Sequence, residues 1–244
     1  MRARLLVVAT LGALGCGADG GFGALLERGG GGPTVASRLA QYGGAARARL
    51  ADDFDAAGVA YPPAELTLIA IKDQARLEVW ARRDGGWAWI ADYPVLAASG
   101  GAGPKLREGD GQVPEGIYAI DWLNPRSDFH LSLHVDYPNA FDRAHAAVDG
   151  RAALGGAIMI HGSDVSIGCL AMGDPAIEEL FTLVADTGLW HDGDRARPRV
   201  RAILAPTDLR DHGLAPPADA PGWTRDLYRD LEAALAPFAR PAPR

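Results

Sequence analysis

The sequence predicts a mainly-β domain of the α+β class with helices at its periphery. Short apolar segments recur between residues 64 and 207, and turn-forming glycine, proline and aspartate residues separate them. Apolar residues at helical spacing are confined to a few segments, two of which flank this region. The chain has 244 residues and no internal repeat, so it is long enough to bury a sizeable core.

The first sixteen residues have the layout of an export signal. A basic segment, 1–4, precedes an apolar run, 5–14, that is too short to span a bilayer. Residues 13–16, Ala-Leu-Gly-Cys, resemble the lipobox of bacterial lipoproteins, in which the cysteine receives lipid and becomes the new N-terminus. We therefore expect an export signal at 1–15, lipidation of Cys16, and a glycine-rich tether at 16–33. The alternative is an ordinary cleaved signal in which Cys16 has no role. Both readings place the protein in the bacterial periplasm, and the first attaches it to a membrane through the lipid alone.

Residues 34–63 are predicted to form a packing helix without chemistry of its own. Thr34 is a suitable N-cap and Gly58 a suitable stop, although Gly43 and Gly44 weaken the prediction of an unbroken helix. The apolar residues at spacings of three and four are Val35, Leu39, Tyr42, Ala46, Leu50 and Phe54.

Strands dominate the next region, which extends over residues 64–207. The predicted strands are 66–71, 76–80, 87–90, 93–97, 117–122, 129–135, 157–160 and 199–204. The first two form a hairpin in the simplest interpretation. The tryptophans that these strands carry are Trp80, Trp87 and Trp89. Their spacing favours packing between strands, with sugar stacking as the alternative.

The strand at 129–135 alternates clearly between an apolar and a polar face. Phe129, Leu131, Leu133 and Val135 share one face, and His130, Ser132 and His134 share the other. No acid or cysteine accompanies these histidines at ligand spacing, so no metal site is predicted.

The remaining segments are a loop, a turn and two helices. A loop at 99–116 is long enough to be a binding loop, although a solvated loop would have the same composition. Residues 137–143 are predicted to form a turn, and Asp174 and Pro175 to start a helix over 174–184. Residues 208–244 are a linker followed by a surface helix at 226–238.

Composition excludes some classes of partner. Apolar residues make up 48% and charged residues 23% of the chain, which is ordinary for a globular domain. The formal net charge of −7 and the lack of a basic stripe argue against a nucleic-acid partner. No run of eighteen apolar residues follows the N-terminus, so no membrane-spanning helix is expected there.

A histidine and a cysteine, His161 and Cys169, form the candidate catalytic pair. If Cys16 is lipidated or removed, Cys169 is a single thiol in an oxidising compartment, which is a liability unless it is deeply buried or used. A cysteine attacks a carbonyl as its thiolate, and a neighbouring imidazole can take the thiol proton and return it to the leaving amine. The other interpretation is a structural thiol beside a histidine bonded in the core.

Small residues around this pair suit the same chemistry. Gly162 and Gly168 allow the loop to turn back and the substrate to approach the backbone. N–H groups near Gly168 are available for an oxyanion hole. The acceptor for the second imidazole nitrogen is Ser163 or a backbone carbonyl of the loop.

These residues resemble the catalytic motif of the YkuD-type L,D-transpeptidases. Residues 166–169, Ser-Ile-Gly-Cys, match the Ser-His-Gly-Cys of that family except at Ile167, and the gap back to His161 is shorter than usual. Both departures are similar to the YafK-like branch. Further stretches that resemble this branch are 98–105, 108–116, 124–127, 129–133, 137–139 and 142–143, so that the resemblance covers roughly residues 64–205.

The resemblance implies a YkuD-like mixed β-sandwich with a substrate groove over Cys169. It also implies that residues 64–207 are a catalytic domain. In that domain Cys169 would attack a peptidoglycan stem peptide at the bond from the L-centre of diaminopimelate to D-alanine and form a thioester. An amine or water would then resolve this thioester. No cofactor or metal is implied. The catalytic residues expected are Cys169, His161, Ser163 and Gly168. The substrate-binding residues expected are Lys105, His130, Tyr137, Arg143, Gly162 and Ser166. Lys105 and Arg143 would contact substrate carboxylates, or else be solvated surface charges.

Two alternatives to transpeptidation remain open at this point. The first alternative is a hydrolytic enzyme of the same fold, which releases a peptidoglycan-linked lipoprotein or D-alanine. It is considered because the YafK-like branch includes proteins that cut a lipoprotein off peptidoglycan. The second is a peptidoglycan-binding lipoprotein without catalytic activity.

Overall fold

The computed structural model describes residues 32–188 and 199–240. The predicted export signal, Cys16 and nearly all of the predicted tether lie outside the described residues. No helix within the described ranges has both the length and the apolar character needed to cross a membrane.

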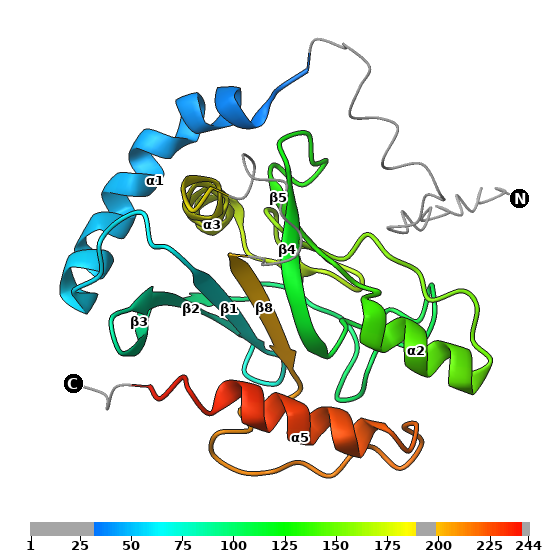
Figure 1. Cartoon of the computed structure of the whole chain (residues 1–244). Coiled ribbons are helices and arrows are strands. Elements are labelled where there is room, and N and C mark those ends of the chain that lie inside the picture. The colour runs from blue at the N-terminus through cyan, green and yellow to red at the C-terminus, as the bar shows by residue number, and fades with distance from the viewer. Residues whose placement is uncertain (1–31, 189–198, 241–244) are drawn as a thin grey trace, which may run out of the picture.

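Eight strands form one curled sheet in the order β3-β2-β1-β8-β4-β5-β6-β7 (Figure 1). Their bounds are β1 Leu66–Ile71, β2 Arg76–Arg83, β3 Gly86–Pro94, β4 Gly116–Asn124, β5 Ser132–Val135, β6 Met159–His161, β7 Leu170–Ala171 and β8 Val200–Ala205. The sheet is mixed, because β1 pairs with β8 and β6 with β7 in parallel, whereas the other neighbours are antiparallel. This arrangement confirms the predicted mainly-β α+β fold.

Strand β4 joins the two halves of the sheet. Its first residues, 116–119, pair with β8, and its later residues, 120–124, pair with β5. The register shifts between Ile120 and Trp122, which is the signature of a β-bulge. A bulge bends a strand and increases its local twist, so the half that carries β5, β6 and β7 turns away from the half that carries β1 and β2.

Two strand predictions were wrong in extent. The segments 87–90 and 93–97 were predicted as separate strands, but β3 runs unbroken to Pro94, and Ala97 makes only an isolated bridge with Ala171. The strand predicted from Phe129 begins at Ser132, because His130 has a positive φ of 71° that interrupts the extended backbone.

Four helices lie around the sheet in the described part of the chain. Their bounds are α1 Val35–Ala57, α2 Ala140–Asp149, α3 Asp174–Asp186 and α5 Thr224–Leu235. Helix α1 has the predicted N-cap at Thr34, which forms a capping box with Ser37, and it ends at Gly58 with a φ of 64°. The prediction of a turn at 137–143 was wrong, because Asn139 caps α2.

Helices cover both faces of the β1–β2–β8 part of the sheet. Helices α1 and α3 pack on one face, where Leu68 and Leu204 belong to the main core, and α5 packs on the other face over Ile69 and Ile203 (Figure 1). Strand β1 is therefore buried along its whole length. The helical segment predicted at 34–63 thus packs on the sheet, and helix α5 of the predicted C-terminal region packs on its other face.

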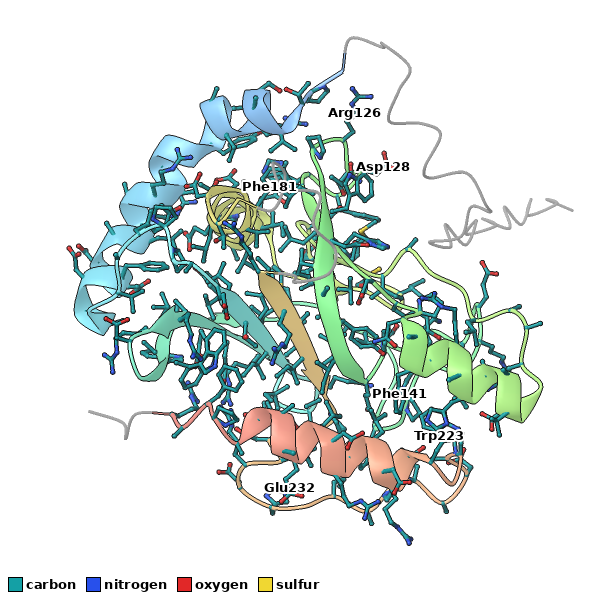
Figure 2. All side chains as sticks on the ribbon, in the orientation of Figure 1. Arg126, Asp128, Phe141, Phe181, Trp223 and Glu232 are labelled. Atoms are coloured by element: carbon teal, nitrogen blue, oxygen red, sulfur yellow. The ribbon has the colours of Figure 1, made fainter. Side chains whose placement is uncertain are left out.

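The tryptophans of β2 and β3 pack beneath the C-terminal segment. Trp80 is buried, and its ring and that of Trp87 contact the ring of Phe238, at centroid distances of 5.4 and 5.1 Å. Trp89 packs against the same apolar cluster. These contacts favour the packing interpretation over sugar stacking. Figure 2 shows a second aromatic contact on this side, where Trp223 meets Phe141 of α2.

A buried carboxylate ties the C-terminal segment to the sheet. Glu78 of β2 is fully buried, and it accepts hydrogen bonds from Arg76, Trp80 and Arg210. Burial acts to raise the pKa of Glu78, yet the hydrogen bonds from Arg210 and Trp80 hold it below the usual value. Arg240 contributes a further ion pair.

Candidate active site

The sheet register places His161 and Cys169 on one face. His161 lies opposite Ala171 in the parallel pair of β6 and β7. Cys169 lies just before β7, two residues from Ala171. If the strand alternation is extended back by one residue, the side chains of His161 and Cys169 are expected to point the same way. Strand spacing and rise put their Cα atoms about 8 Å apart, within reach of the two side chains. Ile160 and Leu170 point to the opposite face, where they belong to the core.

His161 is held in the tautomer that a general base requires. Its Nδ1 lies 2.6 Å from the carbonyl oxygen of Gly162, and because a carbonyl only accepts, Nδ1 carries the proton. The lone pair of the neutral ring is therefore on Nε2. The backbone carbonyl, rather than Ser163, is thus the acceptor for the imidazole.

The surroundings of His161 keep the ring neutral. The side chain is 2% exposed, and the ring of Phe129 lies over it at a centroid distance of 4.7 Å. Burial lowers the pKa of His161 below its usual value, and the bond to Gly162 offsets this only in part. A neutral imidazole can accept a proton at physiological pH.

Cys169 immediately precedes β7 and is 1% exposed. Its Sγ accepts the N–H of Met159 at 3.4 Å and donates to the carbonyl oxygen of Ala157 at 3.7 Å. The sulfur is therefore held as a thiol between two backbone groups. Attack on a carbonyl requires the removal of that proton.

Two serine hydroxyls engage the backbone at the nucleophile. The N–H of Gly168 donates to Ser99 Oγ at 2.7 Å, and the N–H of Cys169 donates to Ser166 Oγ at 3.1 Å. The Ser99 hydroxyl in turn donates to the carbonyl oxygen of Gly111 at 2.5 Å. The expectation that these N–H groups would be unoccupied was wrong, since each already has a hydroxyl acceptor.

Gly162 is a packing glycine. A Cβ at this position would lie 2.7 Å from Asp174 Oδ1, 2.8 Å from the carbonyl oxygen of Phe129 and 3.0 Å from His130 Cβ. The same Asp174 oxygen accepts the N–H of Ser163 at 2.9 Å. The space beside Gly162 that we expected a substrate to occupy is therefore filled by protein atoms. Ser163 contributes its backbone N–H, which donates to Asp174.

The YkuD family model, described as the L,D-transpeptidase catalytic domain, matches residues 66–200. The chain belongs to this family. It is 34% identical over 145 residues to the Escherichia coli protein named "Putative L,D-transpeptidase YafK", an alignment that covers 59% of this chain and 54% of that protein. The chain spans about half the length of the curated relatives it matches.

The solved structures that are similar to parts of this chain include two bacterial proteins. The helical cell shape determining protein Pgp2 from Campylobacter jejuni is 22% identical, with a TM-score of 0.46 over 59% of this chain and 48% of that one. Bd1075 from Bdellovibrio bacteriovorus is 20% identical, with a TM-score of 0.41 over 70% of this chain and 56% of that one.

The loop at 99–116 of this L,D-transpeptidase domain is internally bonded. Asp110 accepts the ammonium of Lys105 at 2.6 Å and the N–H groups of Leu106, Arg107 and Gln112. Lys105 is 7% exposed, so its charge is neutralised inside the loop. Lys105 is therefore not a solvated surface charge, and its contact with a substrate carboxylate stays a prediction.

Three other predicted binding residues make structural contacts. His130 Nε2 lies 3.1 Å from Glu178 Oε1 of α3, and Tyr137 donates to the carbonyl oxygens of Lys105 and Leu154. Arg143 is exposed on α2 and donates to the carbonyl oxygen of Pro138. Of these three, His130 lies beside Gly162, the residue that follows His161.

Sequence reasoning missed two features of the site. Ser99 was treated only as the start of a loop, and no local signal relates it to Gly168, which lies 69 residues away. His134 was considered only as a metal ligand, yet its Nδ1 lies 2.6 Å from Asp121 Oδ1. The alternation of 129–135 had already placed His134 on the polar face. No group of three or more histidine, cysteine or acidic residues that could hold a metal occurs in the described ranges.

Proposed function

We propose that this chain is a cell-wall cysteine acyl-transferase that acts on peptidoglycan stem peptides. The observation that carries the proposal is the bond from His161 Nδ1 to the Gly162 carbonyl, which leaves Nε2 as a base on the face that carries Cys169. Membership of the L,D-transpeptidase family supports the reaction class. The donor bond is the one from the L-centre of diaminopimelate to D-alanine.

The first half-reaction forms a thioester. His161 Nε2 takes the thiol proton, and the sulfur attacks the donor carbonyl carbon to give a tetrahedral oxyanion. The N–H of Cys169 stabilises that oxyanion once the Ser166 hydroxyl, its acceptor in the free protein at 3.1 Å, moves aside. The carbon–nitrogen bond then breaks, and D-alanine leaves with the proton that His161 held.

The second half-reaction decides between transfer and hydrolysis. An amine that attacks the thioester forms a new amide, whereas water forms an acid, and in both cases the sulfur leaves as a thiol. Transfer is the reaction named for the family and for the matched relative. Release of a peptidoglycan-linked lipoprotein by hydrolysis is the second candidate, since the histidine of the family motif is replaced by Ile167, which is 60% exposed.

The proposed location is the bacterial periplasm, with a membrane anchor on Cys16. The support is the basic and apolar layout of residues 1–16 and the eight glycines among residues 17–32. Metabolic labelling with a palmitate analogue tests the anchor. Wild-type protein takes up label and Cys16→Ala does not, whereas an unlabelled wild type would mean a plain cleaved signal.

Muropeptide products test the enzymatic proposal. Purified wild-type protein and Cys169→Ala are incubated with disaccharide-tetrapeptide, and D-alanine and new peptides are measured by mass spectrometry. We expect D-alanine release and a thioester adduct on Cys169 from the wild type alone. Equal inactivity of both proteins, with binding of the muropeptide retained, would instead support the peptidoglycan-binding lipoprotein.

A further inference from the structure

A histidine–aspartate pair lies on the same face of the sheet as Cys169. His134 of β5 lies opposite Met159 of β6, and the β6–β7 register extended by one residue places Met159 beside Cys169. Two strand spacings therefore separate the Cα atoms of His134 and Cys169, a distance of about 10 Å. Leu133 and Val135 point to the other face, into the core, so His134 points to the face of the nucleophile.

The pair has the geometry of a base. Nδ1 of His134 lies 2.6 Å from Asp121 Oδ1, and a carboxylate accepts, so Nδ1 carries the proton and Nε2 presents a lone pair. The side chains of His134 and Asp121 are 22% and 24% exposed, in contrast to the buried His161. A ligand can therefore reach this pair from solvent. The carboxylate also favours a cationic group nearby.

A buried hydroxyl adds an independent observation. Ser132 is 1% exposed, and its Oγ has no hydrogen-bond partner among the described residues. Ser132 lies directly opposite His161, and the bond from the N–H of Gly162 to the carbonyl of Leu131 makes this a non-hydrogen-bonded pair, in which the side chains approach most closely. A buried hydroxyl without a partner destabilises its surroundings, so a ligand group that bonds it would be favoured.

We propose that His134, Asp121 and Ser132 form the acceptor site, and that its ligand is a primary amine. This inference rests on the proposed function. Asp121 of β4 and His134 and Ser132 of β5 lie on one side of β6, and Cys169 lies on its other side, next to β7. A donor bound as thioester and an acceptor would therefore have separate places on one face. The alternative is a partly exposed ion pair with only a small effect on stability.

The step that this site performs is the second half-reaction. The acceptor arrives as an ammonium and gives one proton to His134 Nε2. Its nitrogen lone pair attacks the thioester carbonyl carbon, the carbon–sulfur bond breaks, and the electron pair goes to the sulfur of Cys169. The second proton on nitrogen passes to that sulfur through His161, which leaves an amide, a thiol and a protonated His134.

The test is the ratio of transfer to hydrolysis. Wild type and His134→Gln react with disaccharide-tetrapeptide in ¹⁸O water, with a diaminopimelate-ending tripeptide as the amine, and mass spectrometry measures amide and ¹⁸O-labelled acid. The ratio does not depend on how much thioester forms. His145→Gln is the matched control, because His145 stacks on Trp223 of another surface.

We expect His134→Gln to lower the amide-to-acid ratio at least tenfold and His145→Gln to leave it unchanged. Asp121→Asn, which retains the imidazole, should shift the ratio in the same direction, and it serves if His134→Gln folds poorly. An unchanged ratio in both variants, or a wild type that yields only labelled acid, would overturn the acceptor site while leaving the thioester chemistry intact. A wild type that releases no D-alanine refutes the proposed function itself.

Discussion

The substitution Gly162→Ala separates the packing of the site from its chemistry. An added Cβ would meet the carbonyl oxygen of Phe129 at 2.8 Å and a carboxylate oxygen of Asp174 at 2.7 Å, both closer than a methyl group tolerates. One contact is with backbone, so the strand end itself must shift. Overpacking of this kind costs about 1–3 kcal/mol, which corresponds to a fall in Tm of roughly 2–12 °C for a chain of this size.

The shift also moves the carbonyl that orients His161. A correctly positioned base contributes about 10²–10⁴-fold to the rate, so we expect kcat/KM for D-alanine release to fall at least about 100-fold. Gly44→Ala is the matched control, because no atom lies within 4 Å of the added Cβ and the position is inside helix α1. That variant should gain up to about 1 kcal/mol and keep full activity. An unchanged Tm and kcat/KM in Gly162→Ala would refute the reasoning.

Three further predictions follow from the contacts and pKa shifts. Ser99→Ala removes the acceptor of the Gly168 N–H, so kcat should fall about tenfold with KM little changed. Ser99→Thr, which retains a hydroxyl, should restore kcat. Ser37→Ala on α1 is the control and should change neither constant. Burial lowers the pKa of His161 below 6.5, and only the neutral ring takes the thiol proton, so kcat/KM should rise with pH along a limb whose midpoint is below 6.5; a midpoint above 6.5 would contradict this. Burial raises the pKa of Asp142 to about 6 from an unfolded value of 3.8. The contribution of Asp142 to the free energy of unfolding is therefore fully present below pH 4 and is lost as the pH rises to about 6. The free energy of unfolding should fall over this range by up to about 3 kcal/mol. Asp142→Asn should abolish that pH dependence in urea unfolding, and an equal slope in both proteins would count against it.

Residues near a helix end predicted that end well where capping of the backbone alone decides it. The start of α1 followed from Thr34 and its end from Gly58, because capping needs only a hydroxyl at one end and a left-handed residue at the other. Helix α2 was missed for the opposite reason. Its cap at Asn139 follows Tyr137 and Pro138, which are typical of a turn, and its apolar residues are few.

Contacts between distant segments could not be read from the sequence. The positive φ of His130 ends the predicted strand early, and no composition signal marks a histidine for that conformation. Lys105 was expected to contact solvent or substrate, but Asp110 folds back onto it within the same loop. For the candidate site, the spacing was only weakly diagnostic, and the family resemblance pointed to His161 and Cys169 as a pair. The tautomer of His161 depended on the direction of one carbonyl, which only coordinates reveal.

The buried carboxylate of Glu78 has a consequence for where this domain can be cut. The family model ends at residue 200, yet Arg210 and Arg240, which neutralise Glu78, lie beyond it. A fragment that stops at residue 207 would keep an anion in the sheet with Arg76 alone, and removing a partner of a buried charge costs about 3–5 kcal/mol. It would also uncover Ile69 and Ile203 to water. We therefore expect a stable recombinant unit of this fold to extend to Arg240.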